Sequence, residues 1–374
     1  MDNKKIKILA VIRQGEFGGG ETYLYNLSTN LNPELFETVV LSYSDGNLIR
    51  MLNEKGIKTH IINSSLPFNV LKYGEVKRII KAENPDIVHL HGTRACSNAL
   101  IPAKQMKKKI VYTAHGFSFH DGGSYLGNKI KKRIESYFFG NANITVCGSK
   151  ADLETAKNLN RKAKFRIIKN SIDADYYSPI PKNLTVKKEL GYTESDFIIC
   201  SLARLTFQKD PVTLIRAFSK IESKFENAKL LFVGDGELKE ECLNEVKELG
   251  ISGKVRFETF RPDVKEVLSM LDIFVLPSLW EVVPLGLLEA MSMEIPSIAT
   301  EIPGTNEALK NEENGLTFSK RTSDELAKCI STIIENPEKA KKMAFKARQT
   351  VVNNYNLPDL VKSYEELFPY LNKL

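Results

Sequence analysis

Apolar positions along the chain follow two different periods. Short runs rich in β-branched residues, typical of buried parallel strands, alternate with longer stretches whose apolar residues recur at helical spacing. In the first half, the runs cover residues 5–12, 37–44, 57–63, 86–92, 109–116, 143–149 and 165–172. This alternation predicts βαβ units and a parallel sheet, which binds ligands in loops at the carboxyl ends of its strands.

The alternation stops once and then restarts. The stretch DADYYSPIPKNLTV has two prolines and no periodicity, which indicates a linker. Further strand-like runs cover residues 196–205, 229–236, 254–260, 273–278 and 296–300, and from about Ser323 the pattern is helical. We therefore expect an α/β protein with two doubly wound, Rossmann-like domains facing a cleft. The first would span 1–178, with 358–374 crossing back to it, and the second 179–357.

Length and composition are those of an ordinary globular protein. At 374 residues the chain is too long for one core, and 42% hydrophobic with 26% charged residues excludes disordered and collagen-like chains. The five scattered cysteines argue against a disulfide framework or a zinc ribbon. The start runs directly into a strand pattern rather than a signal peptide, and no apolar run approaches the roughly 18 residues of a membrane span. We expect a cytoplasmic protein.

Positive charge is concentrated in the first half. Residues 1–180 hold 27 Lys and Arg against 16 Asp and Glu, a balance of +11, whereas the remainder holds 26 against 30, or −4. This asymmetry indicates an anionic partner for the first half, such as a membrane surface, a nucleic acid or a phosphorylated substrate. The aromatic-interleaved platform expected for single-stranded nucleic acid is missing, so we expect no nucleic-acid partner.

The first candidate motif, GEFGGGETYLYNL, places glycines between the first strand and a helix. Gly15, Gly18, Gly19 and Gly20 would let a ligand approach the backbone, and the helix start offers unpaired N–H groups to a phosphate. Their spacing is not the G-x-G-x-x-G of dinucleotide binding. A plain tight turn is the alternative.

The second motif, PSLWEVVPLGLLEAMSM, lies at a strand-to-helix junction. Pro284 suits the first helical position, so Leu285 and Gly286 would present free N–H groups to an anion. Glu281 and Glu289 would repel a phosphate, so they suit sugar hydroxyls better. Two ordinary helix-associated glutamates are the alternative.

The third motif, SLARLTFQKDP, carries two cations after a strand. Arg204 could bind two oxygens of a departing diphosphate through its planar guanidinium, and Lys209 could neutralise its charge as a point charge. The alternative is a solvated pair of loop cations.

In this order the three motifs resemble the family 4 glycosyltransferases, retaining nucleotide-sugar enzymes of the GT-B fold. The resemblance covers essentially the whole chain. The family's Gly-Gly loop is matched by Gly18 and Gly19, its Arg and Lys pair by Arg204 and Lys209, and its two glutamates, with seven residues between them, by Glu281 and Glu289. The segments IIKNSIDADYYSP, LLFVGDGEL and IPGTNEALKNEENGLTF add support.

The resemblance implies roles for these residues. Glu281 would bond hydroxyls of the donor sugar, Glu289 the ribose, and the N–H groups of Leu285 and Gly286 the distal phosphate. His115 matches the family's active-site histidine, although a lone histidine at a strand end is often structural.

The chain departs from the family pattern at three positions. The loop reads Glu-Val-Val-Pro-Leu where many members have Glu-Gly-Phe-Gly-Leu, so a backbone donor is lost at Pro284 and a ring is missing at Val283. Ser171 replaces the usual interdomain glycine. These changes affect the expected donor sugar more than the reaction class.

Metal binding is not indicated by the motifs. Asp173 and Asp175 resemble an Asp-x-Asp metal motif, but they lie in the linker and suit a turn. His89 and His91 share one face of a strand and lack a third ligand at suitable spacing. We expect no metal and no cofactor other than the donor nucleotide sugar, expected to be UDP-linked.

The segment 128–139 combines basic and aromatic residues. Ile130, Ile134, Tyr137 and Phe138 recur at helical spacing among four cations. Such a helix can lie on an anionic membrane surface, or it can pack its apolar stripe on the sheet. The first alternative fits a lipid-linked acceptor.

The expected reaction is transfer of a hexose to an acceptor hydroxyl with retention, in the assembly of a surface polysaccharide. No carboxylate is placed as a nucleophile on the sugar's far face, which favours attack from the same face as the leaving group. A sugar-nucleotide epimerase and a non-catalytic sugar-nucleotide or membrane-binding protein are the alternatives. Cations placed for a leaving group argue against mere binding.

Overall fold

The computed structural model describes residues 4–16, 18–117, 119 and 124–373. The chain forms two compact units. The first unit comprises Met1–Ser171 and Leu357–Leu374, and the second unit comprises Ile172–Asn356. The chain therefore changes unit at Ser171, before the proline-containing stretch, whereas the sequence pattern placed the change at residue 178.

The first unit is built on a seven-stranded parallel sheet. Its strands are β1 (Ile6–Ile12), β2 (Phe36–Ser42), β3 (Lys58–Ile61), β4 (Ile87–His91), β5 (Lys109–Ala114), β6 (Ile144–Cys147) and β7 (Phe165–Ile167). Their order across the sheet is β3-β2-β1-β4-β5-β6-β7. Each of the seven predicted strand runs overlaps one of these strands, which confirms the doubly wound prediction for this part of the chain.

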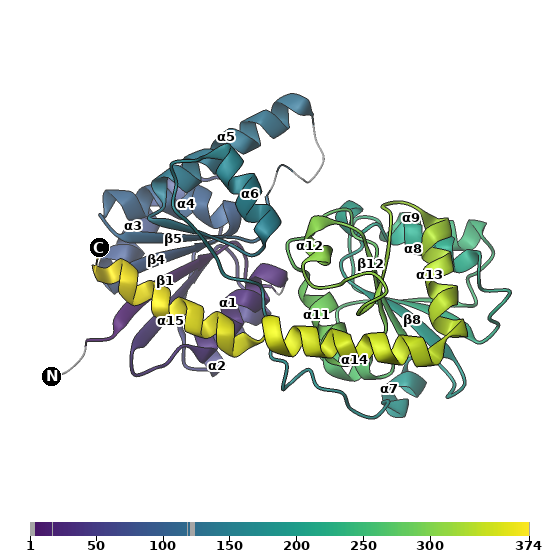
Figure 1. Cartoon of the computed structure of the whole chain (residues 1–374). Helices are drawn as coiled ribbons and strands as arrows, with labels where there is room; N and C mark the ends of the chain where they lie inside the picture. Colours follow the sequence, from purple (N-terminus) through teal and green to yellow (C-terminus); the bar gives the residue numbers. More distant parts are fainter. Residues whose placement is uncertain (1–3, 17, 118, 120–123, 374) are drawn as a thin grey trace. The chain divides into compact units, whose positions relative to one another are not determined.

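Helices cover both faces of this sheet (Figure 1). They are α1 (Gly19–Asn30), α2 (Asn47–Glu54), α3 (Tyr73–Glu83), α4 (Gly92–Gln105), α5 (Tyr125–Asn141), α6 (Lys150–Leu159) and α15 (Leu357–Lys373), with a short 3₁₀ turn, η1, at Val70–Lys72. The buried residues of α3 to α6 share one core, and those of α1 and α15 share another on the opposite face. Tyr364, Leu367 and Phe368 of α15 are buried in the core that α1 shares, within the first unit.

The second unit repeats the plan with six parallel strands. These are β8 (Phe197–Leu202), β9 (Ala228–Val233), β10 (Val255–Glu258), β11 (Ile273–Leu276), β12 (Ser297–Thr300) and β13 (Leu316–Phe318), in the order β10-β9-β8-β11-β12-β13. The helices are α7 (Leu184–Glu189), α8 (Pro211–Ser219), α9 (Lys239–Glu248), α10 (Val264–Ser269), α11 (Leu285–Ser292), α12 (Pro303–Asn306), α13 (Ser323–Glu335) and α14 (Pro337–Asn354), with a 3₁₀ turn, η3, at Phe207–Lys209. The sequence pattern missed β13, which is only three residues long.

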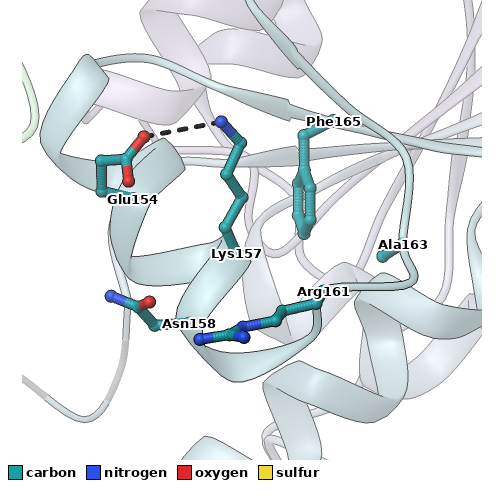
Figure 2. A pocket seen from close by; sticks show the side chains of 6 residues that line it. All are labelled: Glu154, Lys157, Asn158, Arg161, Ala163 and Phe165. Atoms are coloured by element: carbon teal, nitrogen blue, oxygen red, sulfur yellow. Dashed lines mark hydrogen bonds and ion pairs between the residues drawn. The ribbon is translucent and has the colours of Figure 1, made fainter.

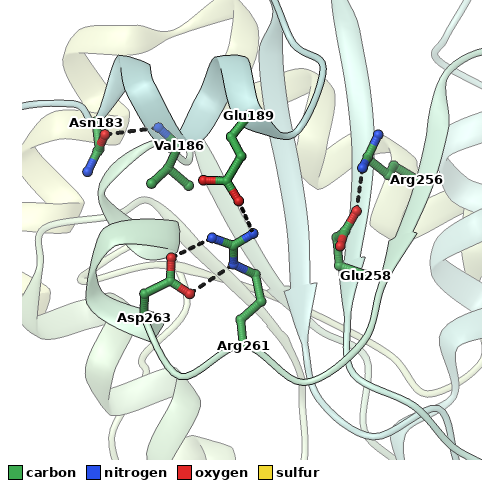
Figure 3. Close-up of polar contacts among 7 residues, drawn as sticks. All are labelled: Asn183, Val186, Glu189, Arg256, Glu258, Arg261 and Asp263. Atoms are coloured by element: carbon green, nitrogen blue, oxygen red, sulfur yellow. Dashed lines mark hydrogen bonds and ion pairs between the residues drawn. The ribbon is translucent and has the colours of Figure 1, made fainter.

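Local polar contacts fix the start of the second unit. The Asn183 side chain accepts a hydrogen bond from the Val186 amide and so caps α7. The Arg261 guanidinium binds both carboxylate oxygens of Asp263 and also Glu189 on α7 (Figure 3). These carboxylates raise the pKa of Arg261, whose side chain is only 16% exposed. Arg261 therefore ties α7 to the loop that precedes α10.

Each sheet has one point at which the strand order reverses. The reversal lies between β1 and β4 in the first unit and between β8 and β11 in the second. Open α/β sheets bind ligands at the carboxyl ends of the two strands that flank such a switch point. The two switch points are therefore the places where functional side chains are to be sought.

Candidate functional site

The switch point of the second unit gathers three of the predicted charged side chains. Arg204 follows the end of β8, is exposed, and has no side-chain partner within the described ranges. Lys209, in η3, forms an ion pair with Glu281, which follows β11. Their side chains are only 17% and 9% exposed, so the pair is largely shielded from water. The sequence motifs alone did not predict this direct contact.

Backbone contacts hold the two charged loops together. The Gln208 side chain donates to the Trp280 carbonyl at 2.8 Å, and the Leu279 amide donates to the Gln208 carbonyl at 2.7 Å. Both bonds join the residues that come just before Lys209 and Glu281 in the chain. The relative position of the two side chains is therefore set by the loops and not by the ion pair alone.

Glycines allow three loops to converge on this switch point. A Cβ atom on Gly234 or Gly236 would lie 2.2 or 2.3 Å from the carbonyl oxygens of Ala203 or Leu205, which flank Arg204. A Cβ atom on Gly304 would lie 2.0 Å from the carbonyl oxygen of Glu281. No side chain fits at these distances, so the segments containing GDG and PGT need glycine to position the charged loops.

The amino terminus of α11 lies beside the end of β8. The helix begins at Leu285, so Pro284 is the residue before the helix and not its first residue, as we had expected. The amides of Leu285 and Gly286 are still available to a ligand, because the first amides of a helix have no hydrogen-bond partner within the helix. A Cβ atom on Gly286 would lie 3.5 Å from the Leu202 carbonyl, an ordinary contact, so packing alone does not require glycine there.

Glu289 lies one turn into α11 and is buried. Its carboxylate accepts a hydrogen bond from the Tyr177 hydroxyl, a partner that the sequence motifs did not indicate. Desolvation by burial raises the pKa of Glu289 to about 7, and the bond from Tyr177 opposes that shift. Glu289 can therefore take up or release a proton near neutral pH.

The switch point of the first unit is occupied by neutral imidazoles. His115 follows β5, and its Nε2 lies 3.1 Å from Nδ1 of His91 at the end of β4. Burial lowers the pKa of His115 to about 4, with a smaller contribution from Arg13, and it lowers the pKa of His91 well below its usual value. The Nε2 atom of His91 is buried without a hydrogen-bond partner in the part of the chain that the structure describes.

The glycine loop contacts His115 through Gly20. A Cβ atom on Gly20 would lie 3.2 Å from the imidazole ring, whereas one on Gly19 would meet nothing within 4 Å. Gly18 precedes α1 in extended conformation, and a Cβ atom there would approach the Glu21 carboxylate at 2.8 Å. The structure thus ties Gly20 to the histidine, although the family motif had directed us to Gly18 and Gly19.

A chain of hydrogen bonds lies beneath the histidines. Nε2 of His89 lies 2.7 Å from the Thr113 hydroxyl, which lies 2.8 Å from the hydroxyl of Tyr364 on α15. The Tyr23 hydroxyl, on α1, donates to Tyr364 at 2.8 Å. Burial lowers the pKa of His89 to about 3, so this chain is neutral in ordinary buffers. It connects α1, the sheet and α15 within the first unit.

Metal ligands are not assembled in the described ranges, where no three His, Cys, Asp or Glu side chains are placed to hold an ion. Oδ1 of Asp173 accepts hydrogen bonds from the amides of Asp175 and Tyr176. This confirms the turn role that we predicted for the Asp-x-Asp sequence.

Two hollows lie away from the switch points. One, of about 400 Å³, is bordered by α6 residues and by Phe165 at the start of β7 (Figure 2). The other, of about 460 Å³, is bordered by Phe197, Asp272 and Pro296 at the amino ends of β8, β11 and β12. Both lie at the amino ends of strands, so neither belongs to the sites described above.

Helix α5 contains the basic segment 128–139. Glu135, Phe138 and Phe139 are buried against the sheet, whereas Ile130 and Ile134 are exposed. The sequence pattern had grouped Phe138 with the two isoleucines on one stripe, and this grouping is wrong. The helix packs through one face and leaves a separate apolar stripe uncovered by the residues that the structure describes.

The family of the chain follows from two models that match it in succession. The model for glycosyltransferase family 4 matches residues 17–176, and the model for glycosyl transferases group 1 matches residues 183–350. Together they cover most of both units, from α1 to α14. The chain is a family 4 glycosyltransferase. Its two parallel-sheet units are the Rossmann-like domains of the GT-B fold.

Relatives of this glycosyltransferase align over nearly the whole chain. The UDP-Gal:alpha-D-GlcNAc-diphosphoundecaprenol alpha-1,3-galactosyltransferase of Escherichia coli is 26% identical, over 98% of this chain and 97% of its own. The N-acetyl-alpha-D-glucosaminyl L-malate synthase of Bacillus anthracis is 28% identical, over 85% and 91%. The crystal structure of Anabaena HepE, in complex with UDP and glucose, superposes with a TM-score of 0.86 at 21% identity, covering 97% and 99%. No described helix of the glycosyltransferase is long and apolar enough to cross a membrane.

Proposed function

We propose that this glycosyltransferase moves a hexosyl group from a nucleoside diphosphate sugar to an acceptor hydroxyl, with retention at the anomeric carbon. The observation that carries this proposal is the second unit's switch point, where the Lys209–Glu281 pair and the start of α11 lie beside Arg204, which has no side-chain partner in the described part of the chain. Fixed cations and backbone dipoles stabilise the charge that develops on a leaving diphosphate. Glu281 supplies acceptor oxygens for sugar hydroxyls within the same loops.

We assign each part of the donor, the diphosphate, the sugar and the ribose, to specific protein groups. Arg204, Lys209 and the amides of Leu285 and Gly286 bind the diphosphate. Glu281 binds the transferred sugar, and Glu289, held by Tyr177, binds the ribose. We take the base to be uracil, because the name of the E. coli relative specifies a UDP-sugar donor.

The reaction exchanges one bond at the anomeric carbon. The bond from that carbon to the phosphate oxygen breaks, and a bond to the acceptor oxygen forms on the same face of the sugar. The acceptor's proton passes to the departing phosphate oxygen. Arg204 and Lys209 supply the charge neutralisation that a divalent ion could otherwise supply, so we propose that turnover needs no metal. His115, half-buried and neutral, is assigned to orienting the acceptor hydroxyl by accepting a hydrogen bond, without taking up its proton.

The proposed acceptor is a lipid-linked glycan at the inner face of the membrane. One support is the E. coli relative, whose name gives a diphosphoundecaprenol acceptor. The other is α5, where Leu126, Ile130, Ile134 and Tyr137 are exposed at intervals of four, four and three residues. Lys129 and Arg133 are exposed beside them. An apolar stripe edged by cations suits peripheral binding to anionic lipid.

A mass-spectrometric screen of nucleotide sugars tests the reaction. Purified protein is expected to release a nucleoside diphosphate from one of them, and release should increase when a lipid-linked acceptor is added. Conversion of the donor to an isomer without acceptor would instead indicate an epimerase. Binding without any turnover would indicate a non-catalytic protein.

Liposome flotation tests the membrane proposal. The double variant I130S/I134S removes half of the exposed stripe and is expected to bind phosphatidylglycerol vesicles about tenfold more weakly than the unaltered protein. The control F345S/V352S removes two apolar residues that are exposed on α14. Equal losses in both variants, or equal binding of unaltered protein to phosphatidylcholine, would contradict the proposal.

A further inference from the structure

Two arginines flank the switch point of the first unit. The register pairs Val11 of β1 with Leu90 of β4, and His91 of β4 with Thr113 of β5. Arg13 therefore directly follows β1, and Arg94 lies in the first turn of α4, which follows the adjacent strand β4 at the same edge of the sheet. His115 follows the next strand, β5. The three side chains start from neighbouring strand ends where this fold places its ligands.

The two guanidinium groups have few partners. Arg94 donates through Nη2 to the Ser64 carbonyl at 2.5 Å, and its Nε is buried without a hydrogen-bond partner. Within the described ranges no carboxylate lies within 4.0 Å of it. Arg13, 45% exposed, meets one carboxylate, that of Glu21, through Nε at 3.3 Å. In the described part of the chain the two arginines at this switch point therefore have one carboxylate partner between them, and it contacts Arg13.

Electrostatic effects confirm that Arg13 lies near both other groups. Burial lowers the pKa of Arg94, and the charge of Arg13 lowers it further. The charge of Arg13 also lowers the pKa of His115, in addition to the larger lowering caused by burial. Two like charges held close together with a single carboxylate between them are unfavourable, so such an arrangement is expected where a ligand brings further negative charge.

Arg261 in the second unit shows what a structural arginine looks like in this molecule. Its guanidinium is held on three of its nitrogens by Asp263 and Glu189 (Figure 3). Arg94 is also partly buried but contacts only one carbonyl. Structural anchoring therefore accounts for Arg261 and leaves most donors of Arg94 unexplained.

We propose that Arg94 and Arg13 bind an anionic group of the acceptor, a phosphate or a carboxylate, beside His115. This inference rests on the proposed glycosyl transfer, because it assigns the anion to the molecule whose hydroxyl reacts. A guanidinium fork binds two oxygens of either anion at once, which fixes the direction of the acceptor as well as holding it. The substrate class is then an acceptor with an anion close to its reacting hydroxyl.

Inorganic pyrophosphate and succinate serve as probes of the two anion chemistries. Each is titrated into the full-length protein saturated with UDP, and hydrogen exchange of peptides covering residues 13–16 and 91–98 reports binding at the switch point. We expect one probe to protect both peptides. R94Q should weaken that binding tenfold or more, and R94K less, because lysine keeps the charge but loses the fork. Circular dichroism checks that both variants fold.

R78Q is the matched control, since Arg78 is an exposed arginine of the same unit. Its probe affinity should stay within twofold of the unaltered value. Equal losses in R78Q and R94Q would overturn the inference, because attraction would then be nonspecific. Unchanged probe affinity in both R94Q and R94K would overturn it too. So would a parallel loss of UDP affinity in R94Q, which would place Arg94 at the donor.

These experiments distinguish failure of the anion-site inference from failure of the proposed glycosyl transfer. If the protein neither bound UDP nor turned over any nucleotide sugar, yet R94Q still abolished protection by a probe, the glycosyl transfer would fail while the anion site would stand. If turnover occurred and R94Q bound both probes normally, the reaction would stand and the assignment of the acceptor's anion would fail.

Discussion

The two switch points of this glycosyltransferase differ in the charge state of the groups that they hold. In the second unit an ion pair joins Lys209 and Glu281, and nearby Arg204 has no side-chain partner among the residues that the structure describes. In the first unit the strand ends carry His91 and His115, whose pKa values burial lowers so far that both are neutral. The same sheet topology thus supports an ion pair beside an arginine in one unit, and neutral imidazoles flanked by Arg13 and Arg94 in the other.

This difference matches two different chemical demands. A leaving diphosphate gains negative charge, which fixed cations stabilise. An acceptor hydroxyl must lose a proton while it attacks, and a neutral imidazole beside it can accept a hydrogen bond, which an imidazolium cannot. The cations of the second unit should therefore affect the rate most, and the histidines of the first unit somewhat less.

The largest effect is expected at the charged switch point. Lys209→Ala and Arg204→Ala should each reduce kcat by about 10²- to 10³-fold, because each removes a cation from the developing charge. Acceptor-dependent release of nucleoside diphosphate measures this. Lys220→Ala, which removes an exposed lysine paired with Asp324, should be nearly neutral. Near-normal turnover in both active-site variants would defeat the assignment.

His115→Asn should lower kcat by about 10²-fold, the scale expected when a reacting hydroxyl loses the group that orients it. His91→Asn removes the ring that contacts it and should cost about tenfold. Because the folded pKa of His115 is about 4, we expect its protonation to cause no loss of kcat/KM between pH 5 and 8. An acid limb near pH 6.5 that disappears in His115→Asn would show that this histidine is not held neutral.

Each unit also contains one buried glutamate with a raised pKa. Burial raises the pKa of Glu135 on α5, bonded to Thr93 and Tyr112, to about 7, as it does for Glu289. The folded state keeps the proton that the unfolded state releases near pH 4.5. Stability is therefore lost as pH rises from about 4.5 to 7, on the order of 3 kcal/mol for each group.

Glu135→Gln and Glu289→Gln should remove this dependence in their own units. The stability of each variant relative to the unaltered protein should increase between pH 5 and pH 8. Urea unfolding followed by hydrogen exchange reads each unit separately. A relative stability that is constant across this range would mean that the carboxylate is not held protonated.

The strands were predictable because buried parallel strands leave unbroken apolar runs, and twelve of the thirteen were identified from them. The exception, β13, has only three residues, and so short an apolar run is not recognisable as a strand after the polar segment that precedes it. The boundary of the first unit was placed too late because proline content marked the extended stretch rather than the change of unit, which occurs at Ser171.

The candidate site was less predictable, because its contacts join residues far apart in the chain. The motifs identified Lys209 and Glu281 separately, but only the pairing of β8 with β11 brings them together. Likewise Tyr177 and Glu289 meet only in the folded unit. Arg13 and Arg94 belong to no motif, and the signal for them is the strand register and their lack of carboxylate partners.

The smallest effect compares one buried tyrosine from each unit. Tyr364→Phe breaks hydrogen bonds to Tyr23 and Thr113, leaving those hydroxyls without that partner, whereas Tyr355→Phe breaks one bond to the Glu307 carbonyl. A net loss of about 1 kcal/mol per bond predicts roughly 2 kcal/mol for Tyr364→Phe and 1 for Tyr355→Phe. Thermal unfolding measures both. If Tyr355→Phe lost as much stability as Tyr364→Phe or more, the chain of hydrogen bonds from His89 to Tyr23 would add nothing beyond a single hydrogen bond. The arrangement of the histidines in the first unit would then depend on packing alone.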